Sequence, residues 1–186
     1  MKKCISIVAL LALIATGAFA QSSMFSVGGG AYFDLGILTP DGADDNQMGV
    51  GGYGFFDLTY AEIDVGFGYY RLLDAEVYGA DLNFAVLGKY PINMGSFTLF
   101  PLLGVKLDIP LTQSYDGEKN DDYEVADNMR LGFQVGIGFD FPLSESLFIR
   151  PSVLFNLNLF APGEDPFDDT LYSVGPMVKV GVGYKF

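Results

Sequence analysis

The 186-residue sequence predicts an all-β fold, an eight-stranded antiparallel up-and-down transmembrane β-barrel. Three observations support this prediction. Apolar residues recur at every second position in many segments, which is the period of a β-strand. Several of these segments reach the ~9–11 residues that a tilted strand needs to cross a bilayer. The connections between them are alternately short and long, as in up-and-down barrels that span a membrane.

The composition narrows the function classes. Half of the residues are hydrophobic, yet the formal net charge is −13 and the pI is about 4.1, so there is no basic surface for nucleic acid. Histidine is absent, which removes the commonest general base and metal ligand. The single cysteine, Cys4, lies in the N-terminal segment. We therefore expect no enzymatic activity, no cofactor and no metal site.

The N-terminal segment is predicted to be an export signal. Lys2 and Lys3 precede an apolar run over residues 5–16, and small residues follow up to Ala20. The alternative, an uncleaved membrane anchor, is disfavoured because the run is short for a span of about 20 residues. We expect residues 1–20 to be a signal peptide cleaved after Ala20, and residues 21–186 to form one barrel domain.

The first four predicted strands lie in the N-terminal half of the chain. In the first, Phe25, Val27 and Phe33 share an apolar face that alternates with glycine and polar residues. The second strand is ambiguous, because Tyr53 and Phe55 compete with the opposite-parity residues Val50 and Phe56 for that face. The third and fourth strands alternate clearly. The predicted ranges are 25–37, 49–56, 61–70 and 80–90.

The last four predicted strands are longer and alternate more regularly. In the final strand, Val178, Val180 and Val182 share one face, while Lys179, Gly181 and Gly183 share the other. The predicted ranges are 97–109, 129–141, 147–160 and 171–186. Three of these strands contain an interior proline, which removes a ladder hydrogen bond, so we expect β-bulges at Pro101, Pro151 and Pro176.

The connections differ in charge as well as in length. Residues 57–60, 91–96 and 142–146 are short turns. The four longer loops, 38–48, 71–79, 110–128 and 161–170, carry fifteen of the 23 acidic residues, accompanied only by the bases Arg71 and Lys119. Solvated acidic loops explain this composition simply. An alternative hypothesis is that this acidic rim binds divalent cations weakly, although no loop has the spacing of an EF-hand.

The faces of the strands decide between a membrane barrel and a soluble sandwich. No charge falls on the apolar face of the seven clear strands, and the opposite face is rich in glycine rather than in the polar residues of a water-exposed surface. The apolar face therefore meets lipid. The charges are predicted to form a paired network in the lumen, which consists of Asp34, Glu62, Asp64, Asp81, Lys89, Lys106, Asp108, Arg130, Asp140, Arg150, Lys179 and Lys185.

The chain ends with an alternating apolar–aromatic pattern at Val182, Tyr184 and Phe186, which looks like the assembly signal of outer-membrane proteins. The mature chain resembles the small outer-membrane barrel families typified by the OmpA transmembrane domain, OmpX/Ail and OmpW, although it contains no tryptophan. The resemblance implies a bacterial outer-membrane location. It also implies outer-membrane lipid and the barrel assembly machinery as partners.

Two motifs suggest chemistry but have simpler explanations. Gly49-Val50-Gly51-Gly52-Tyr53-Gly54 fits a dinucleotide-binding pattern, yet that pattern requires a following helix, and here an aromatic strand follows. Glu62 and Asp64 could form an acid–base pair. Outer-membrane barrel enzymes rely on histidine, however, so these carboxylates are expected to pair with Lys and Arg in the lumen.

The sequence supports two hypotheses about function. The first is a non-enzymatic, monomeric barrel with a structural or adhesin-like role, whose acidic extracellular loops contact host or envelope surface molecules. The alternative is a porin-like narrow pore or an OmpW-like conduit for small or hydrophobic solutes, in which the inward glycines leave a water-filled path. Eight strands enclose an interior that side chains can fill, which favours the first hypothesis.

Overall fold

The computed structural model describes residues 25–39, 46–73, 77–115, 118–119, 129–160 and 172–186. The predicted signal peptide and its cleavage site at Ala20 lie outside these residues, as does most of the acidic loop sequence. Within the described ranges, no helix is long and apolar enough to cross a membrane.

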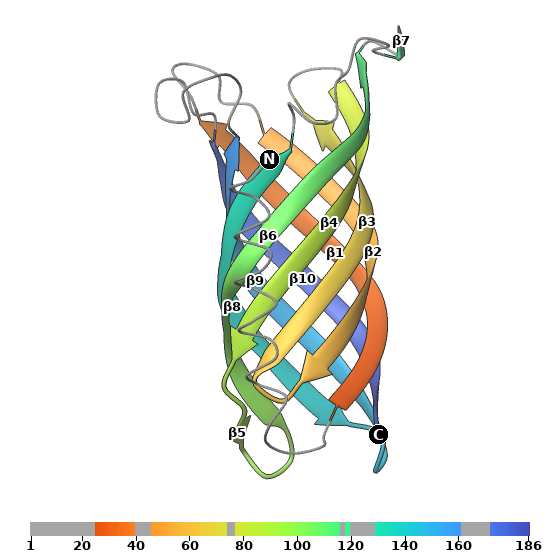
Figure 1. Cartoon of the computed structure of the whole chain (residues 1–186), viewed down its shortest axis with the longest axis vertical. Helices are drawn as coiled ribbons and strands as arrows, with labels where there is room; N and C mark the ends of the chain where they lie inside the picture. Colours follow the sequence, from red (N-terminus) through yellow and green to blue (C-terminus); the bar gives the residue numbers. More distant parts are fainter. Residues whose placement is uncertain (1–24, 40–45, 74–76, 116–117, 120–128, 161–171) are drawn as a thin grey trace, which may run out of the picture.

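Eight long strands form a closed antiparallel barrel, as the sequence predicts (Figure 1). Each long strand pairs with the next one along the chain, including β4 with β6, and pairing of β1 with β10 closes the ring of hydrogen bonds. The long strands are β1 (Phe25–Thr39), β2 (Asn46–Leu58), β3 (Ala61–Leu72), β4 (Val77–Lys89), β6 (Thr98–Tyr115), β8 (Arg130–Pro142), β9 (Leu147–Phe160) and β10 (Tyr172–Lys185). Two short strands, β5 (Ile92–Asn93) and β7 (Glu118–Lys119), pair antiparallel with the two ends of β6.

The strands differ from the predicted ranges mainly at the end that carries the longer loops. β6 continues to Tyr115, six residues beyond the predicted limit, because Gly79 and Val77 of β4 pair with Gln113 and Tyr115. These residues are polar or alternate weakly, so the sequence did not mark them as strand. A backbone pair near the membrane surface does not require an apolar side chain.

The apolar faces point outward and the polar faces point inward. Val65, Phe133 and Val180 are among many exposed hydrophobic residues on the outer wall. The structure also resolves the ambiguous second strand. Tyr53 and Phe55 lie in the lumen, only 7% and 4% exposed, while Val50 faces outward. Since the lumen accepts aromatic rings, hydrophobicity alone could not assign the faces of β2.

The bulges expected at the three interior prolines are absent. Within the described strands, the one register shift is between Ala80 and Asp81 of β4, where Pro110 of β6 pairs with Asp81. Pro151 keeps its pair with Val180 of β10, and Pro176 keeps its pair with Phe155 of β9.

On the opposite sides of these two prolines, the ladders to β8 and β1 skip two pairs without changing register. Pro101 pairs with Ile137 of β8 and lies one residue beyond the last pair between β4 and β6. The missing N–H groups are therefore accommodated by local gaps in the ladder rather than by inserted residues.

Several glycines in the lumen lie beneath aromatic rings of other strands. A Cβ atom added to Gly183 would overlap the ring of Phe148, and one added to Gly138 would overlap that of Phe100. Gly28 has the same relation to Phe55, as Gly51 and Gly68 have to Tyr32. These glycines therefore make room for rings in the lumen, rather than leaving that space open.

Candidate functional site in the barrel lumen

The densest part of the lumen is a charged layer around Arg150, near the end of the barrel where the short turns lie. Arg150 is 1% exposed and donates hydrogen bonds to Asp140 at 2.7 and 2.8 Å and to Asp57 at 2.5 Å, and it also bonds Glu62. Lys89 donates to the same Asp57 carboxylate, at 2.5 Å. One guanidinium thus joins carboxylates from β2, β3 and β8.

Aromatic rings surround this layer and close the space between the charges. The guanidinium carbon of Arg150 lies 4.7 Å from the ring centre of Phe55, 4.8 Å from that of Phe148 and 5.0 Å from that of Phe100. Such cation–π contacts are stronger where water is excluded. Leu87 and Leu102, both buried, belong to the same cluster. Together the charges and rings form a buried layer that joins strands on different sides of the lumen.

Asp57 is the functional residue that the sequence reasoning missed. The prediction placed it in the turn 57–60, but β2 continues to Leu58 and Asp57 faces inward, 4% exposed. Its position has the same parity as Tyr53 and Phe55. Had those two rings been assigned to the lumen, alternation would have placed Asp57 there too.

A second group of charges lies deeper in the barrel, centred on Lys179. Lys179 bonds Asp64, lies 3.9 Å from a carboxylate oxygen of Glu62, and has its ammonium 4.4 Å from the ring centre of Tyr53. Glu62 thus bridges the Arg150 layer and the Lys179 group. Both carboxylates of the suspected acid–base pair are engaged by cations in this way.

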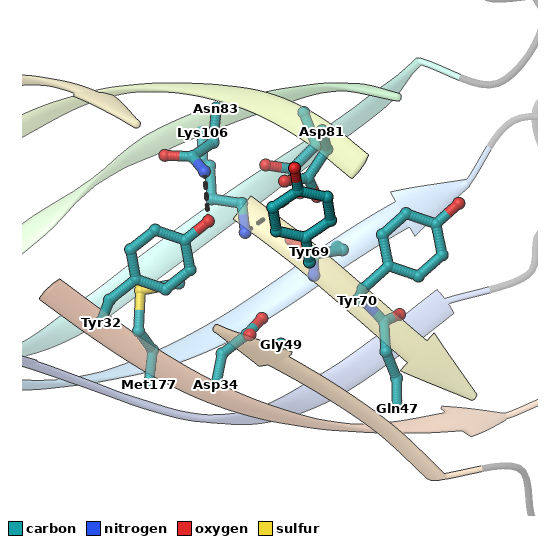
Figure 2. A pocket seen from close by; sticks show the side chains of 12 residues that line it. Tyr32, Asp34, Gln47, Gly49, Tyr69, Tyr70, Asp81, Asn83, Lys106 and Met177 are labelled. Carbon is teal, nitrogen blue, oxygen red and sulfur yellow. Dashed lines mark hydrogen bonds and ion pairs between the residues drawn. The ribbon is translucent and has the colours of Figure 1, made fainter. Parts of the chain in front are cut away.

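The third group lies toward the longer loops, beside the hollow drawn in Figure 2. Lys106 pairs with Asp108 at 3.0 Å, and Arg130 pairs with Asp81 at 3.3 Å. Asp34 faces the same hollow. The hollow is small: its volume is about 10 Å³, which is room for roughly one water molecule.

A second hollow of the same size lies beside the first, and both are lined by Tyr32, Asn83, Lys106 and Met177. Asn83 donates a 2.8 Å hydrogen bond to the Tyr32 hydroxyl (Figure 2). This hydrogen bond lies where the two hollows meet. Neither hollow approaches the size of a ligand pocket, which is hundreds of Å³.

The structure brings ten of the twelve predicted lumen charges into ion pairs with one another or with Asp57. The other two are placed differently: Asp34 lines the hollow near Lys106, and Lys185 lies with its ammonium 4.9 Å from the ring centre of Phe148. With Asp57 included, seven acids face six bases. Removing one partner of such a buried pair is strongly destabilising, because the other charge is then left buried and uncompensated.

The structure bears only partly on the expected metal and loop features. Among the described residues, no group of three or more carboxylates is arranged to hold a metal ion. Most of the acidic loop residues lie outside those ranges, so the cation hypothesis for the rim stays a prediction. Gly49 to Gly54 lie within β2, in continuous pairing with β1 and β3.

The C-terminal residues of the predicted assembly signal lie on the outer wall. Val182, Tyr184 and Phe186 are all exposed. The ring of Phe186 stacks on that of Phe25, with centres 4.7 Å apart, and Tyr184 meets Phe186 edge-on at 5.0 Å. The last residue thus contacts the first strand at the seam where β1 and β10 close the barrel.

Comparison with known families and structures agrees with this architecture. Residues 6–186 match the outer membrane protein beta-barrel domain family. No curated protein sequence matches the chain. Among solved structures, Neisserial surface protein A is 13% identical with a TM-score of 0.56, over 89% of this chain and 100% of that one.

Two further structures are less similar. The N-terminal β-barrel domain of Pseudomonas aeruginosa OprF is 15% identical, with a TM-score of 0.47, over 87% of this chain and 97% of that one. Ail, the attachment invasion locus protein of Yersinia pestis, was solved with the heparin analogue sucrose octasulfate. It is 16% identical, with a TM-score of 0.45, over 89% of this chain and 100% of that one.

Proposed function

Because the chain belongs to the outer membrane protein beta-barrel domain family, whose members lie in the bacterial outer membrane, we propose that it is a closed, non-enzymatic barrel whose acidic extracellular loops contact molecules at the cell surface. The observation that carries this proposal is the Arg150 layer. A buried guanidinium held by three carboxylates and three rings lies in the lumen where a pore would have to pass, which supports a closed barrel.

The geometry supports contact through the loops rather than transport through the barrel. The two hollows in the lumen each hold roughly one water molecule, and the Arg150 layer separates them from the short-turn end. The chemically distinctive part of the sequence is then the four longer loops, which carry fifteen acidic residues. Such loops favour cationic partners, or partners that bind through bridging cations.

Conductance measurements test the closed lumen. The full-length protein, reconstituted in a planar bilayer, is expected to give no reproducible single-channel steps. The variant Arg150→Ala removes the plug and is expected to raise conductance if it keeps the barrel, which gel mobility of boiled and unboiled samples reports. Regular steps from the wild-type protein would overturn the closed-lumen proposal and favour a pore.

Photo-cross-linking tests the role of the loops. A cross-linking amino acid at residues 121–124, in the longest acidic loop, is expected to capture surface molecules on intact cells. The same amino acid in the short turn 143–146 serves as the control, since that turn lies at the opposite end of the barrel. Equal capture from both positions, or none from the loop, would contradict the proposal.

A further inference from the structure

One charged side chain breaks the apolar outer wall of the barrel. Along the outward positions of the eight long strands within the described residues, Arg71 near the end of β3 is the single charge. It shares the outward face with Phe67 and Tyr69, which precede it at alternate positions. The predicted strand ended at residue 70, so the sequence had assigned Arg71 to a loop.

The height of Arg71 on the barrel corresponds to a membrane surface. Arg71 lies eleven residues after Tyr60, an exposed aromatic residue in the turn at the opposite end. At about 3.3 Å per residue and a tilt of about 40°, this separation spans roughly 28 Å along the barrel axis. The apolar band of such barrels is ≈ 25 Å tall. Arg71 therefore lies just beyond the hydrocarbon, at the level of the lipid headgroups of the outer leaflet.

The neighbours of Arg71 on the outer wall include tyrosines, which are typical of the level of the lipid headgroups. Tyr69 is 62% exposed and Tyr78, paired with Arg71 across the β3–β4 ladder, is 41% exposed. Met48 is the corresponding partner on β2. Tyrosines are enriched where hydrocarbon meets headgroups, because the ring lies in an apolar region and the hydroxyl reaches polar partners.

Arg71 forms no ion pair with any residue in the described part of the chain. Every other Lys and Arg of the described strand interiors faces the lumen. We propose that Arg71, which shares this part of the outer wall with Tyr69 and Tyr78, binds a phosphate group on the headgroup of an outer-leaflet lipid.

Two physical arguments favour a lipid phosphate as the occupant. A guanidinium group presents a planar fork of hydrogen-bond donors that matches the oxygens of a phosphate group. These hydrogen bonds are stronger at the edge of an apolar phase, because water competes less for the donors there. The surrounding loop sequence is acidic and would repel anionic headgroups, so a single cation on the wall, below those loops, offers the complementary charge. This inference is independent of what the loops bind.

Lipid retention in native mass spectrometry tests the site. The full-length protein in mild detergent is mixed with diphosphoryl lipid A, and the lipid-bound fraction is compared for wild type, Arg71→Gln and Arg71→Lys. Arg71→Gln is expected to weaken retention roughly tenfold, since a charge-assisted interaction is lost, and Arg71→Lys is expected to restore part of it. Lys119→Gln is the matched control, because it removes the same charge from the short strand β7 instead of from the wall of a long strand.

Each outcome decides the proposal. Retention unchanged in Arg71→Gln overturns it, and equal losses in Arg71→Gln and Lys119→Gln show a general charge effect instead of a site. A diacylglycerol, which carries no phosphate, is expected to be retained equally by all variants, and weaker retention of it by Arg71→Gln would overturn the proposal. If inorganic phosphate displaces bound lipid A as effectively as added lipid A does, the site binds free phosphate and the lipid site is refuted. Boiled and unboiled gel mobility verifies that each variant forms the barrel.

Discussion

Replacing Arg150 with methionine tests the charged layer most directly. The methionine side chain keeps much of the apolar contact with Phe55, Phe100 and Phe148 but removes the guanidinium. Asp57 would keep Lys89, and Glu62 would keep Lys179 at 3.9 Å, whereas Asp140 would lose its sole ion-pair partner among the described residues. All of these carboxylates are nearly inaccessible to water.

The expected cost follows from the unpaired carboxylate. Removing one partner of a buried ion pair destabilises a protein by about 3–5 kcal/mol. Total stability is typically about 5–15 kcal/mol, so Arg150→Met removes a large fraction of it. The free energy of unfolding is measured by urea titration of the barrel in lipid vesicles, with the fraction folded read from gel mobility.

A second substitution separates charge from packing. Adding Asp140→Asn to Arg150→Met removes the stranded charge, so the double variant is expected to regain stability relative to Arg150→Met alone. Arg150→Lys keeps the positive charge but loses the planar fork of donors, so its stability is expected to lie between those of wild type and Arg150→Met. If the free energy of unfolding of Arg150→Met lies within about 1 kcal/mol of the wild-type value, the expected cost of an unpaired buried charge is absent and the reasoning about this layer is refuted.

Three other predictions follow from the wall and the lumen. Gly183→Val should lower the free energy of unfolding in urea by about 1–3 kcal/mol, because the valine side chain overlaps the Phe148 ring. The control is the outward Gly54→Ala, which should change stability little because its Cβ meets only the Gly28 carbonyl oxygen, at 3.7 Å. Equal effects of the two substitutions would contradict the ring packing. Val135→Lys places a charge at the middle of the lipid-facing side of β8 and should lower the free energy of unfolding by about 2–4 kcal/mol in the same assay. Leu131→Lys, also outward but nearer the end of β8, should lower it less, and the opposite order would argue against this placement of the bilayer. Phe186→Ala should slow the appearance of the heat-modifiable gel band in cells more than Leu143→Ala in a short turn does, and equal assembly rates would remove Phe186 from the assembly signal.

The alternation of apolar and polar residues was enough to predict the barrel, its strand order and the inward position of most charges. The bilayer penalises each outward charge, so period two is strict along the outer wall. The same rule failed where both faces of a strand carry apolar residues. β2 has Tyr53 and Phe55 inside, and that ambiguity also concealed Asp57 at its end.

The partners of the charges could not be predicted from the sequence. Arg150 and Glu62 are 88 positions apart and meet because the strands tilt and stagger by amounts that only the closed barrel determines. Loop residues near Tyr115 and Arg71 were also misassigned, because backbone pairing continues beyond the apolar band, where side-chain hydrophobicity no longer reports strand structure.

The packing of lumen rings on glycines has a consequence for how such a chain diverges. A larger residue at position 183 requires a smaller one at position 148, so these two positions are expected to change together. Positions on the outer wall, such as Val135 and Val180, require only an apolar side chain and can vary independently. Relatives of this barrel should therefore preserve correlated inner pairs while their outer sequences drift, and coupled substitutions between β9 and β10 would be the most durable trace of common descent.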